Sequence, residues 1–370
     1  MVEEVLFCIG CGAQIQIDDE SKPGYTPSSV LKKGLETGQL YCKRCFRLRN
    51  YNEIQDVNIA DDEFLKLLNE VGQSDSLIVN VIDIFDFNGS LIPSLTRFVG
   101  HNPILIVANK RDILPKSIKD SRIRQWLIEQ AHQAGIKPID VILTSAHKKQ
   151  AVEPVVAAIE KYRAGKDVYV VGVTNVGKST LINQIINFST GEQDIITTSR
   201  FPGTTLDKIE IPLADGQVLF DTPGIIHRHQ MAHYIGERDL KIVSPQKEIK
   251  PKTYQLNPEQ TLFLAGLARF DFIQGERQSF TGYFSNDLEI HRTKLEKATD
   301  FYQKHLGELI QPPHQDEVAD FPKLVRHEFS IKEPTDIVFS GLGWLKVREK
   351  AVIAAWVPQG VSVLIRKSII

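Results

Sequence analysis

The sequence predicts an α/β domain with a mostly parallel sheet, between a short cysteine-rich module and a C-terminal β-rich α+β domain. Continuous apolar runs such as Ser76–Asp83 and Ile104–Ala108 alternate with helical periodicities, as expected of parallel strands covered on both faces. All four cysteines lie within the first 45 residues, and beyond about residue 235 strand-like runs dominate. We therefore expect domains at residues 1–55, 56–232 and 233–370.

The composition is that of a globular protein. The chain has 370 residues, of which 42% are hydrophobic and 24% charged, and this length predicts two or three domains. A net charge of −2 excludes a global basic field, so any nucleic-acid surface must be local. We see no apolar run of about eighteen residues and hence expect no membrane span. The acidic start lacks the character of a signal peptide, which predicts a cytoplasmic location; the oligomeric state is not predicted.

Two Cys-x2-Cys pairs, Cys8/Cys11 and Cys42/Cys45, open the chain. Four thiolates suit a tetrahedral zinc site. The gap of about thirty residues between the pairs leaves room for a hairpin or a treble-clef-like loop. Disulfides are disfavoured in an intracellular chain, and an iron–sulfur cluster is a weaker alternative with the same ligands. We favour structural zinc.

Basic and aromatic side chains alternate around the second cysteine pair: Tyr41, Lys43, Arg44, Phe46, Arg47, Arg49 and Tyr51. Cations for phosphates and aromatic faces for unstacked bases are what RNA-binding zinc knuckles present. A solvated basic face that caps the neighbouring domain explains the pattern equally well.

The α/β region begins with an amphipathic helix from about Asp61 to Val71, followed by the two buried strands. Between the strands lies a polar turn with Asp83, Asp86, Asn88 and Ser90, which we interpret first as turn and cap residues and only second as ligand contacts.

The second buried strand runs into Asn109-Lys110-Arg-Asp112, the motif with which GTPases read guanine. The Asp112 carboxylate would accept hydrogen bonds from guanine N1–H and the exocyclic amine, and adenine would leave it unpaired. Asn109 would address the other base edge or tie the loop to the phosphate loop, and the Lys110 stem would pack on the ring. After the strand Val141–Leu143, Thr144-Ser145-Ala146 matches the loop whose backbone N–H contacts guanine O6.

The stretch Gly172-Val-Thr-Asn-Val-Gly-Lys-Ser179 fits Gly-x4-Gly-Lys-Ser, a phosphate-binding P-loop, between a strand and a helix. Its backbone N–H groups and the helix N-terminus would surround the phosphates. Lys178 would reach the β- and γ-phosphates, and the Ser179 hydroxyl would ligate Mg2+. The nucleotide-binding residues expected here are Gly172, Asn175, Val176, Gly177, Lys178, Ser179 and Thr180.

Two further segments complete the set. In the loop 199–207, Thr205 would complete Mg2+ coordination and sense the γ-phosphate. The strand Gln217–Phe220 enters Asp221-Thr-Pro-Gly224, where Asp221 would hold Mg2+ through water and the Gly224 N–H would bond the γ-phosphate. The order along the chain is guanine, guanine, phosphate, magnesium, γ-phosphate. That order predicts a circular permutation, with Ala164-Gly-Lys166 as the linker that joins the usual ends of the domain.

The C-terminal region reads as strands with one helix, around Arg292 to His305. Its basic clusters, such as the one around Lys346 and Arg348, are more often solvated than functional. Three histidines, at positions 227, 229 and 233, lack a further ligand nearby, so we interpret them as exposed switch histidines.

With these motifs the chain resembles the circularly permuted GTPases and, through the N-terminal four-cysteine module, their YqeH family. The resemblance covers essentially the whole chain. It implies a GTPase that acts in assembly of the small (30S) ribosomal subunit and binds 16S rRNA or its precursor particle. A signalling GTPase whose flanking domains bind proteins is the alternative, and a scaffold that holds GTP only structurally is a third possibility.

Two residues bear on hydrolysis. Ile225 occupies the position where Ras-like proteins keep a water-orienting Gln, which predicts slow intrinsic turnover. By resemblance, Asn175 matches the asparagine that holds K+ in cation-dependent GTPases, although a loop-stabilising role explains it as well.

Overall fold

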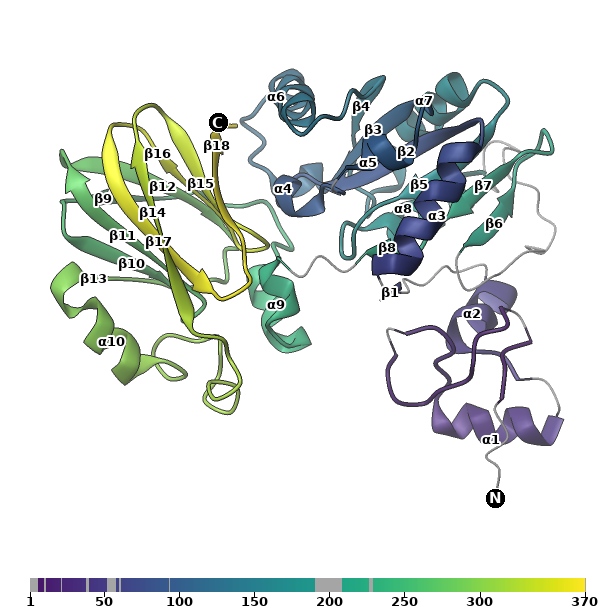
Figure 1. The fold of residues 1–370 in the computed structure, drawn as a ribbon, viewed down its shortest axis with the longest axis horizontal. Coiled ribbons are helices and arrows are strands. Elements are labelled where there is room, and N and C mark those ends of the chain that lie inside the picture. The colour runs from purple at the N-terminus through teal and green to yellow at the C-terminus, as the bar shows by residue number, and fades with distance from the viewer. Residues whose placement is uncertain are drawn as a thin grey trace. The chain divides into compact units, whose positions relative to one another are not determined.

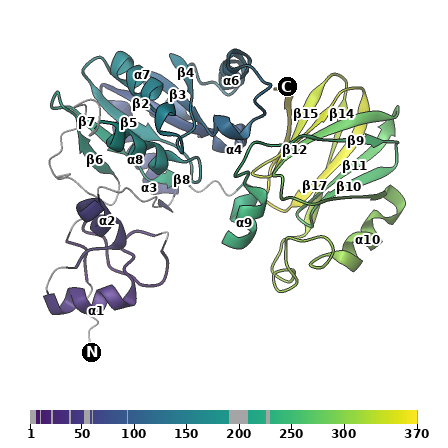
Figure 2. The same ribbon diagram turned by 180° about the vertical axis from the view of Figure 1, so that it is seen from behind.

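The structure, a computed structural model, describes all residues except 1–5, 10, 21, 38–39, 52–57, 60, 93, 190–207, 226–228 and 370 (Figures 1 and 2). The chain forms two compact units. The first comprises Met1–Ile84, Ser90–Arg111 and Arg124–Ile226, and the second comprises Phe85–Gly89, Asp112–Ile123 and His227–Ile370. The domain boundaries at residues 55/56 and 232/233 stay a prediction.

The cysteine-rich module contains little regular structure. Isolated bridges join Phe7 to Gln14 and Gln16 to Tyr25. Helix α1 (Ser28–Thr37) lies between the two cysteine pairs, and helix α2 (Lys43–Tyr51) begins within the second pair. The gap in which the sequence predicts a hairpin or a treble-clef-like loop therefore contains a ten-residue helix.

The α/β sheet has six strands in the order β4-β3-β2-β5-β7-β6, and only β6 runs antiparallel to its neighbour. Every residue of β2 and β3 is buried, so both faces of the sheet are covered as predicted. The strands are β2 (Ser76–Asp83), β3 (Ile104–Asn109), β4 (Asp140–Leu143), β5 (Asp167–Val171), β6 (Ile209–Pro212) and β7 (Val218–Asp221).

Strand β5, which leads into the P-loop, follows β2, β3 and β4 in the chain yet lies centrally, between β2 and β7. The three strands that precede it all lie on one side of it, which confirms the permuted order. A separate pair joins β1 (Asn58–Ile59) to β8 (Gly224–Ile225) in parallel. The helices are α3 (Asp61–Gln73), α4 (Phe87–Ser90), α5 (Leu95–Phe98), α6 (Asp120–Gln133), α7 (Glu153–Arg163) and α8 (Lys178–Ser189), with short 3-10 turns at Arg111–Ile113 and Lys149–Ala151. No described helix is long and apolar enough to cross a membrane.

The C-terminal β domain consists of two antiparallel five-stranded sheets, ordered β13-β10-β11-β17-β14 and β18-β15-β16-β12-β9 (Figure 1). Strand β11 alternates: Phe270 and Phe272 join the core, where both contact the Phe280 ring at centroid distances of 5.2 and 4.9 Å, respectively. The strands are β9 (Lys252–Leu256), β10 (Gln260–Leu264), β11 (Ala268–Gly275), β12 (Gln278–Phe284), β13 (Ile290–Lys294), β14 (Leu324–Ile331), β15 (Thr335–Phe339), β16 (Gly343–Val347), β17 (Ala351–Pro358) and β18 (Val363–Lys367). Helix α9 (Glu237–Val243) precedes them, and a 3-10 turn spans Met231–His233.

The prediction of a helix from Arg292 was wrong at its start. Residues Ile290–Lys294 form strand β13, a 3-10 turn covers Leu295–Lys297, and helix α10 spans Ala298–His305. Strand β13 is paired along its whole length with β10, so hydrogen bonding to a distant strand outweighs the local helical pattern.

The second unit includes two segments that lie outside the C-terminal sequence. Asn88 Oδ1 accepts a 2.8 Å hydrogen bond from Arg366 Nη1, and the Phe85 ring lies 5.8 Å from the Trp344 ring. Ile113 O accepts a hydrogen bond from Ile249 N at 2.8 Å. These segments are therefore structural parts of that unit.

Candidate nucleotide-binding site and four-cysteine site

The predicted nucleotide-binding residues of the first unit follow neighbouring parallel strands. In the ladder, Val170 pairs with Asp221 and Asp83 pairs with Asn109, so these strands end at the same edge of the sheet. Ser145 follows β4, and Gly172 follows β5 directly. The carboxyl edge of a parallel sheet is where α/β folds bind ligands.

At two positions of the P-loop a residue larger than glycine would clash with neighbouring atoms. Gly177 has a φ of +85°, and a Cβ there would lie 2.4 Å from Asn109 Nδ2. A Cβ on Gly172 would lie 2.8 Å from Val81 O. Asn175, with a φ of 64°, adds a left-handed turn and is exposed. The conformation of the loop thus depends on residues that tolerate positive φ or leave space for neighbouring chain.

The Asn109 side chain connects three segments. Its Nδ2 donates to Val176 O of the P-loop at 2.8 Å, and its Oδ1 accepts from the Ala146 backbone N–H at 2.9 Å. Asn109 is 2% exposed, so these bonds satisfy polar groups that would otherwise be buried unpaired. One amide therefore holds the P-loop and the loop after β4 together.

Lys178 and Asp221 form an ion pair between Nζ and Oδ1, and their side chains are 3% and 4% exposed. Opposite charges this deeply buried must be paired, because a lone charge would carry a large desolvation cost. Beside them, Thr174 N donates to Ile225 O at 2.8 Å. The P-loop is therefore hydrogen-bonded to the residue that follows Gly224.

The remaining predicted residues have varied environments. Val176, Ser179, Ser145 and Ala146 are buried, whereas Thr180 is half-buried. Asp112 lies in the 3-10 turn Arg111–Ile113, is half-buried, and belongs to the second unit. Thr205 and His227 lie outside the described residues.

Sequence reasoning missed a partner of Lys110. The Lys110 Nζ lies 2.6 Å from Asp83 Oδ2, whereas the sequence alone favours a turn role for Asp83. Ser90 does serve the turn, because its Oγ accepts from Asp83 N at 3.1 Å. The available signal was an acidic residue at the end of the mostly apolar run Ser76–Asp83, which precedes the guanine-reading strand in the chain.

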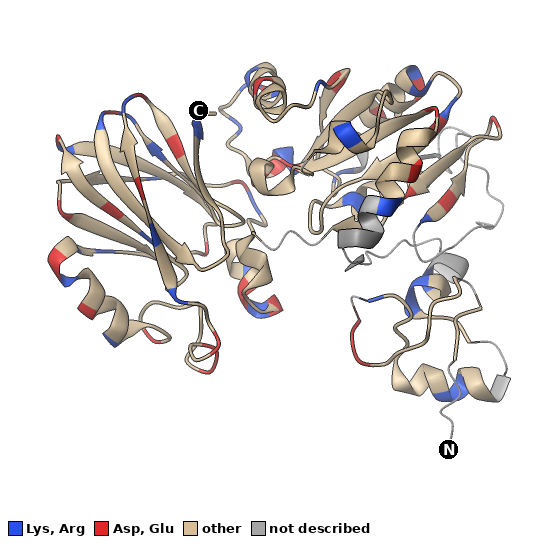
Figure 3. Cartoon of the chain, in the orientation of Figure 1, with Lys and Arg blue, Asp and Glu red and all other residues tan. Residues whose placement is uncertain are grey.

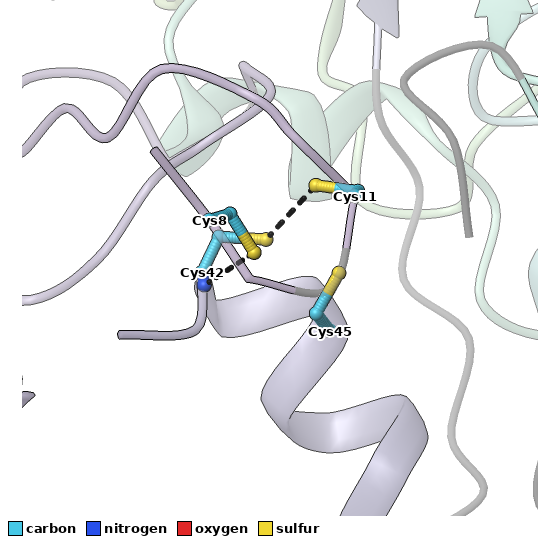
Figure 4. A group of neighbouring side chains, drawn as sticks. All are labelled: Cys8, Cys11, Cys42 and Cys45. Carbon is cyan, nitrogen blue, oxygen red and sulfur yellow. Dashed lines mark hydrogen bonds between the residues drawn. The ribbon is translucent and has the colours of Figure 1, made fainter. Parts of the chain in front are cut away.

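The four cysteines point toward one another (Figure 4). Their sulfur atoms all lie within 4.8 Å of each other, and none forms a disulfide. Cys11 Sγ is 3.8 Å from Cys42 Sγ, and Cys42 N donates to Cys8 Sγ at 3.2 Å. Among the residues that the structure describes, no other group of three or more His, Cys, Asp or Glu side chains could hold a metal.

Hydrogen bonding among the thiols separates their pKa values. A hydrogen bond from Cys11 is the main cause that lowers the pKa of Cys8, and one from Cys42 lowers the pKa of Cys11 to about 7. The bonds to Cys11 in turn raise the pKa of Cys42 and of Cys45. Without a cation, the four thiols therefore resist ionising together.

The basic residues of the second cysteine pair are partly used inside the module. Lys43 pairs with Glu20, and Arg44 is only 7% exposed. Phe46 is exposed, whereas the side chains of Arg49 and Tyr51 lie outside the described residues. In the C-terminal β domain, Lys and Arg are interspersed with Asp and Glu (Figure 3).

The segment after Gly224 continues within the second unit. His229 and His233 are exposed, and the His229 backbone O accepts from Ser362 N at 3.0 Å. Gln230 Nε2 donates to Asp86 Oδ2 at 2.8 Å, and Met231 N donates to Ser340 O at 3.0 Å. This segment is thereby anchored to the C-terminal β domain.

Comparison with known proteins identifies relatives along the whole chain. A family model described as YqeH-like, C-terminal, matches residues 277–369, and one described as 50S ribosome-binding GTPase matches residues 167–257. The chain is 58% identical to the uncharacterized protein YqeH of Bacillus subtilis, over 99% of this chain and 100% of that protein. It is 31% identical to NO-associated protein 1, chloroplastic/mitochondrial, of Arabidopsis thaliana, over 93% of this chain and 70% of that protein. GNP-bound YlqF from T. maritima matches with a TM-score of 0.30 and 19% identity, over 48% of this chain and 70% of that structure.

Proposed function

Because this chain belongs to the YqeH family of circularly permuted GTPases, we propose that it is a switch that binds and hydrolyses GTP during assembly of the small (30S) ribosomal subunit. The Asn109 side chain is the observation that carries the nucleotide part, since it joins the two base-reading loops to the P-loop. We place this activity in the cytoplasm.

In the proposed site, Asp112 accepts from guanine N1–H and the exocyclic amine, the Lys110 stem packs on the ring, and the loop Ser145–Ala146 donates to O6. The P-loop backbone from Gly172 to Thr180 surrounds the phosphates. Lys178 exchanges its bond to Asp221 for the β- and γ-phosphates. Mg2+ would be held by Ser179, Thr205 and, through water, Asp221, and would neutralise charge on the phosphates. Gly224 N–H would donate to the γ-phosphate.

Hydrolysis should be slow, since Ile225 cannot orient the attacking water. We propose that the Asn175 side chain holds a K+ ion, which would offset the negative charge on the phosphates in the transition state. Asn175 is exposed and has a left-handed backbone conformation, so its side chain is accessible to an ion. GTP turnover should then be about tenfold or more faster in KCl than in NaCl, and Asn175→Ala should remove the difference. Equal rates of the wild-type protein in both salts would remove Asn175 from the mechanism.

For the four-cysteine site we propose structural zinc. The donor set fits: four clustered thiols without a disulfide match a tetrahedral zinc site with four cysteine ligands. The bound ion would supply the charge that lets all four thiols ionise and would connect two segments far apart in the sequence. Exposed Phe46 beside this site offers a face for an unstacked RNA base.

The anchored segment after Gly224 supports a mechanism of readout. GTP binding would order Gly224 and so change the position of the segment that follows it. Residues His229, Gln230 and Met231 of this segment are hydrogen-bonded within the second unit, so the change would reach the C-terminal β domain. Hydrolysis of GTP would reverse the ordering of Gly224. Identical cross-linking patterns with GDP and with a GTP analogue would contradict this mechanism.

Co-sedimentation with separated ribosomal subunits tests the proposal. The purified protein is incubated with 30S or 50S subunits, with GDP or a non-hydrolysable GTP analogue, at low and moderate salt. Both subunits are tested because one of the matching family models carries the description 50S ribosome-binding GTPase. Lys178→Ala is the control that loses nucleotide dependence.

We expect GTP-dependent pelleting with the 30S subunit at moderate salt, where non-specific phosphate contacts are weak. Pelleting with the 50S subunit instead would contradict the small-subunit assignment. Binding to both only at low salt would indicate non-specific charge, and no binding in any state would favour the alternative, a signalling GTPase whose flanking domains bind proteins.

A further inference from the structure

The ion pair between Lys110 and Asp83 lies where the proposed guanine-reading loop leaves the sheet. Lys110 Nζ is 2.6 Å from Asp83 Oδ2, and the side chains are 26% and 11% exposed. Asp83 is the last residue of β2 and lies opposite Asn109, the last residue of β3. The carboxylate therefore comes from the strand beside the base-reading strand.

The backbone on both sides of the pair is held in place. Asp83 N donates to Ser90 Oγ at 3.1 Å, and Ile84 N donates to Asn109 O at 3.1 Å. Lys110 has a φ of 65°, a left-handed conformation that is uncommon for lysine, and the next residue, Arg111, donates its N–H to Thr144 O at 2.9 Å. The side chain of Lys110 thus leaves a fixed backbone, and its ammonium meets a fixed carboxylate.

A lysine stem has four rotatable carbon–carbon bonds, so ordering it on a ring has an entropic cost that each binding event must meet. Anchoring the ammonium before the nucleotide arrives lowers that cost, which is the general effect of preorganisation. We propose that Asp83 is a positioning residue of the guanine pocket, which holds the Lys110 ammonium so that the stem lies along the base. The inference rests on the proposed function, specifically on Asn109–Asp112 as the guanine-reading loop.

The alternative for the same geometry is a resting pair that breaks when nucleotide binds. The two hypotheses predict opposite changes in nucleotide affinity when Asp83 is removed. If Asp83 preorganises Lys110, its removal weakens nucleotide binding. If the pair competes with the nucleotide, removal of Asp83 strengthens binding.

Stopped-flow dissociation of mant-GDP from the full-length protein tests the inference. The variants are Asp83→Asn, Lys110→Met and the double variant. Asp215→Asn is the matched control, because Asp215 also pairs with a cation at 2.6 Å, Arg163, but lies in the loop before β7 at the opposite end of that strand. Asp112→Ala reports separately on the guanine-reading loop, and kcat at saturating GTP is measured for each variant.

We expect Asp83→Asn and Lys110→Met each to release mant-GDP about tenfold faster, and the double variant to be no faster than either, since the two side chains act as one unit. The kcat of Asp83→Asn should stay within about twofold of wild type while KM rises, a separation that general destabilisation would not produce. Asp215→Asn should behave as wild type.

Unchanged or slower release from Asp83→Asn, or additive effects in the double variant, would overturn the role of Asp83 alone. If Asp112→Ala also releases mant-GDP at the wild-type rate, the assignment of the guanine-reading loop fails, and the inference fails with it.

Discussion

The two parts that flank the α/β region along the chain are stabilised in different ways. The cysteine-rich module has a cluster of Cys8, Cys42 and Cys45 at its centre, with Ile15 and Tyr41 partly buried around it. The C-terminal β domain has a continuous apolar core drawn from both of its sheets. Most large hydrophobic side chains that stay exposed in the described part of the chain belong to the module: Phe7, Ile9, Ile17, Val30, Leu35 and Phe46.

Because many of its apolar side chains are exposed, we expect the module to depend less on hydrophobic burial than the β domain does. Small chains bury a smaller fraction of their surface on folding than large ones do, so a metal or a cross-link contributes a larger share of their stability. If the four cysteines bind zinc as we propose, one chain combines a module that depends on a metal with a domain that depends on packing.

The largest effect should come from the four cysteines that we propose as zinc ligands. Cys42→Ser removes one of four ligands, and because structural zinc contributes about 10 kcal/mol or more to such modules, the module should unfold. We expect zinc content by mass spectrometry to fall below one ion per chain and protease cleavage to appear in the first fifty residues. The thermal transition of the β domain should not move. A zinc-free module that resists protease would contradict the comparison.

A core substitution in the β domain should lower the stability of that domain and leave the cysteine-rich module unchanged. Phe272→Ala removes a fully buried ring that packs against Phe280, at a cost of about 3–5 kcal/mol in the free energy of unfolding. Zinc content should stay at the wild-type value. Urea unfolding, followed by the near-ultraviolet signal of Trp344 and its neighbours, measures the loss; a cost under about 1 kcal/mol would mean that this core does not hold the domain.

A smaller effect tests whether buried polar contacts also hold the β domain. Trp356 Nε1 donates to Asp271 Oδ2 at 2.8 Å, and Asp271 Oδ1 accepts from both Thr261 and Arg269. Trp356→Phe keeps most of the ring and removes this hydrogen bond to a buried carboxylate, so we expect a loss of about 1–2 kcal/mol. A stability equal to wild type in urea would show that Thr261 and Arg269 suffice for Asp271.

Prediction from sequence succeeded where the signal was local. Strand β2 was predicted with its observed bounds, because it is a continuous apolar run bordered by polar residues. Strand β14 was not predicted, since most of its residues are half or fully exposed and its sequence lacks a clear apolar face. Strand β13 was wrongly predicted as helix, because its conformation is set by pairing with β10, and the local sequence pattern does not contain that information.

By itself, the sequence determined the residue types of the nucleotide loop, the permuted order of its motifs and the four clustered cysteines. Each single motif consists of residues a few positions apart, so the motifs and their order can be read from the linear chain. Only the tertiary structure decided that Lys110 meets Asp83, 27 positions away, and that the tie between Asn109 and the P-loop, one of the two roles expected for it, is a bond to Val176, 67 positions away. Such pairs are set by which strands lie side by side, and strand order is a property of the folded sheet.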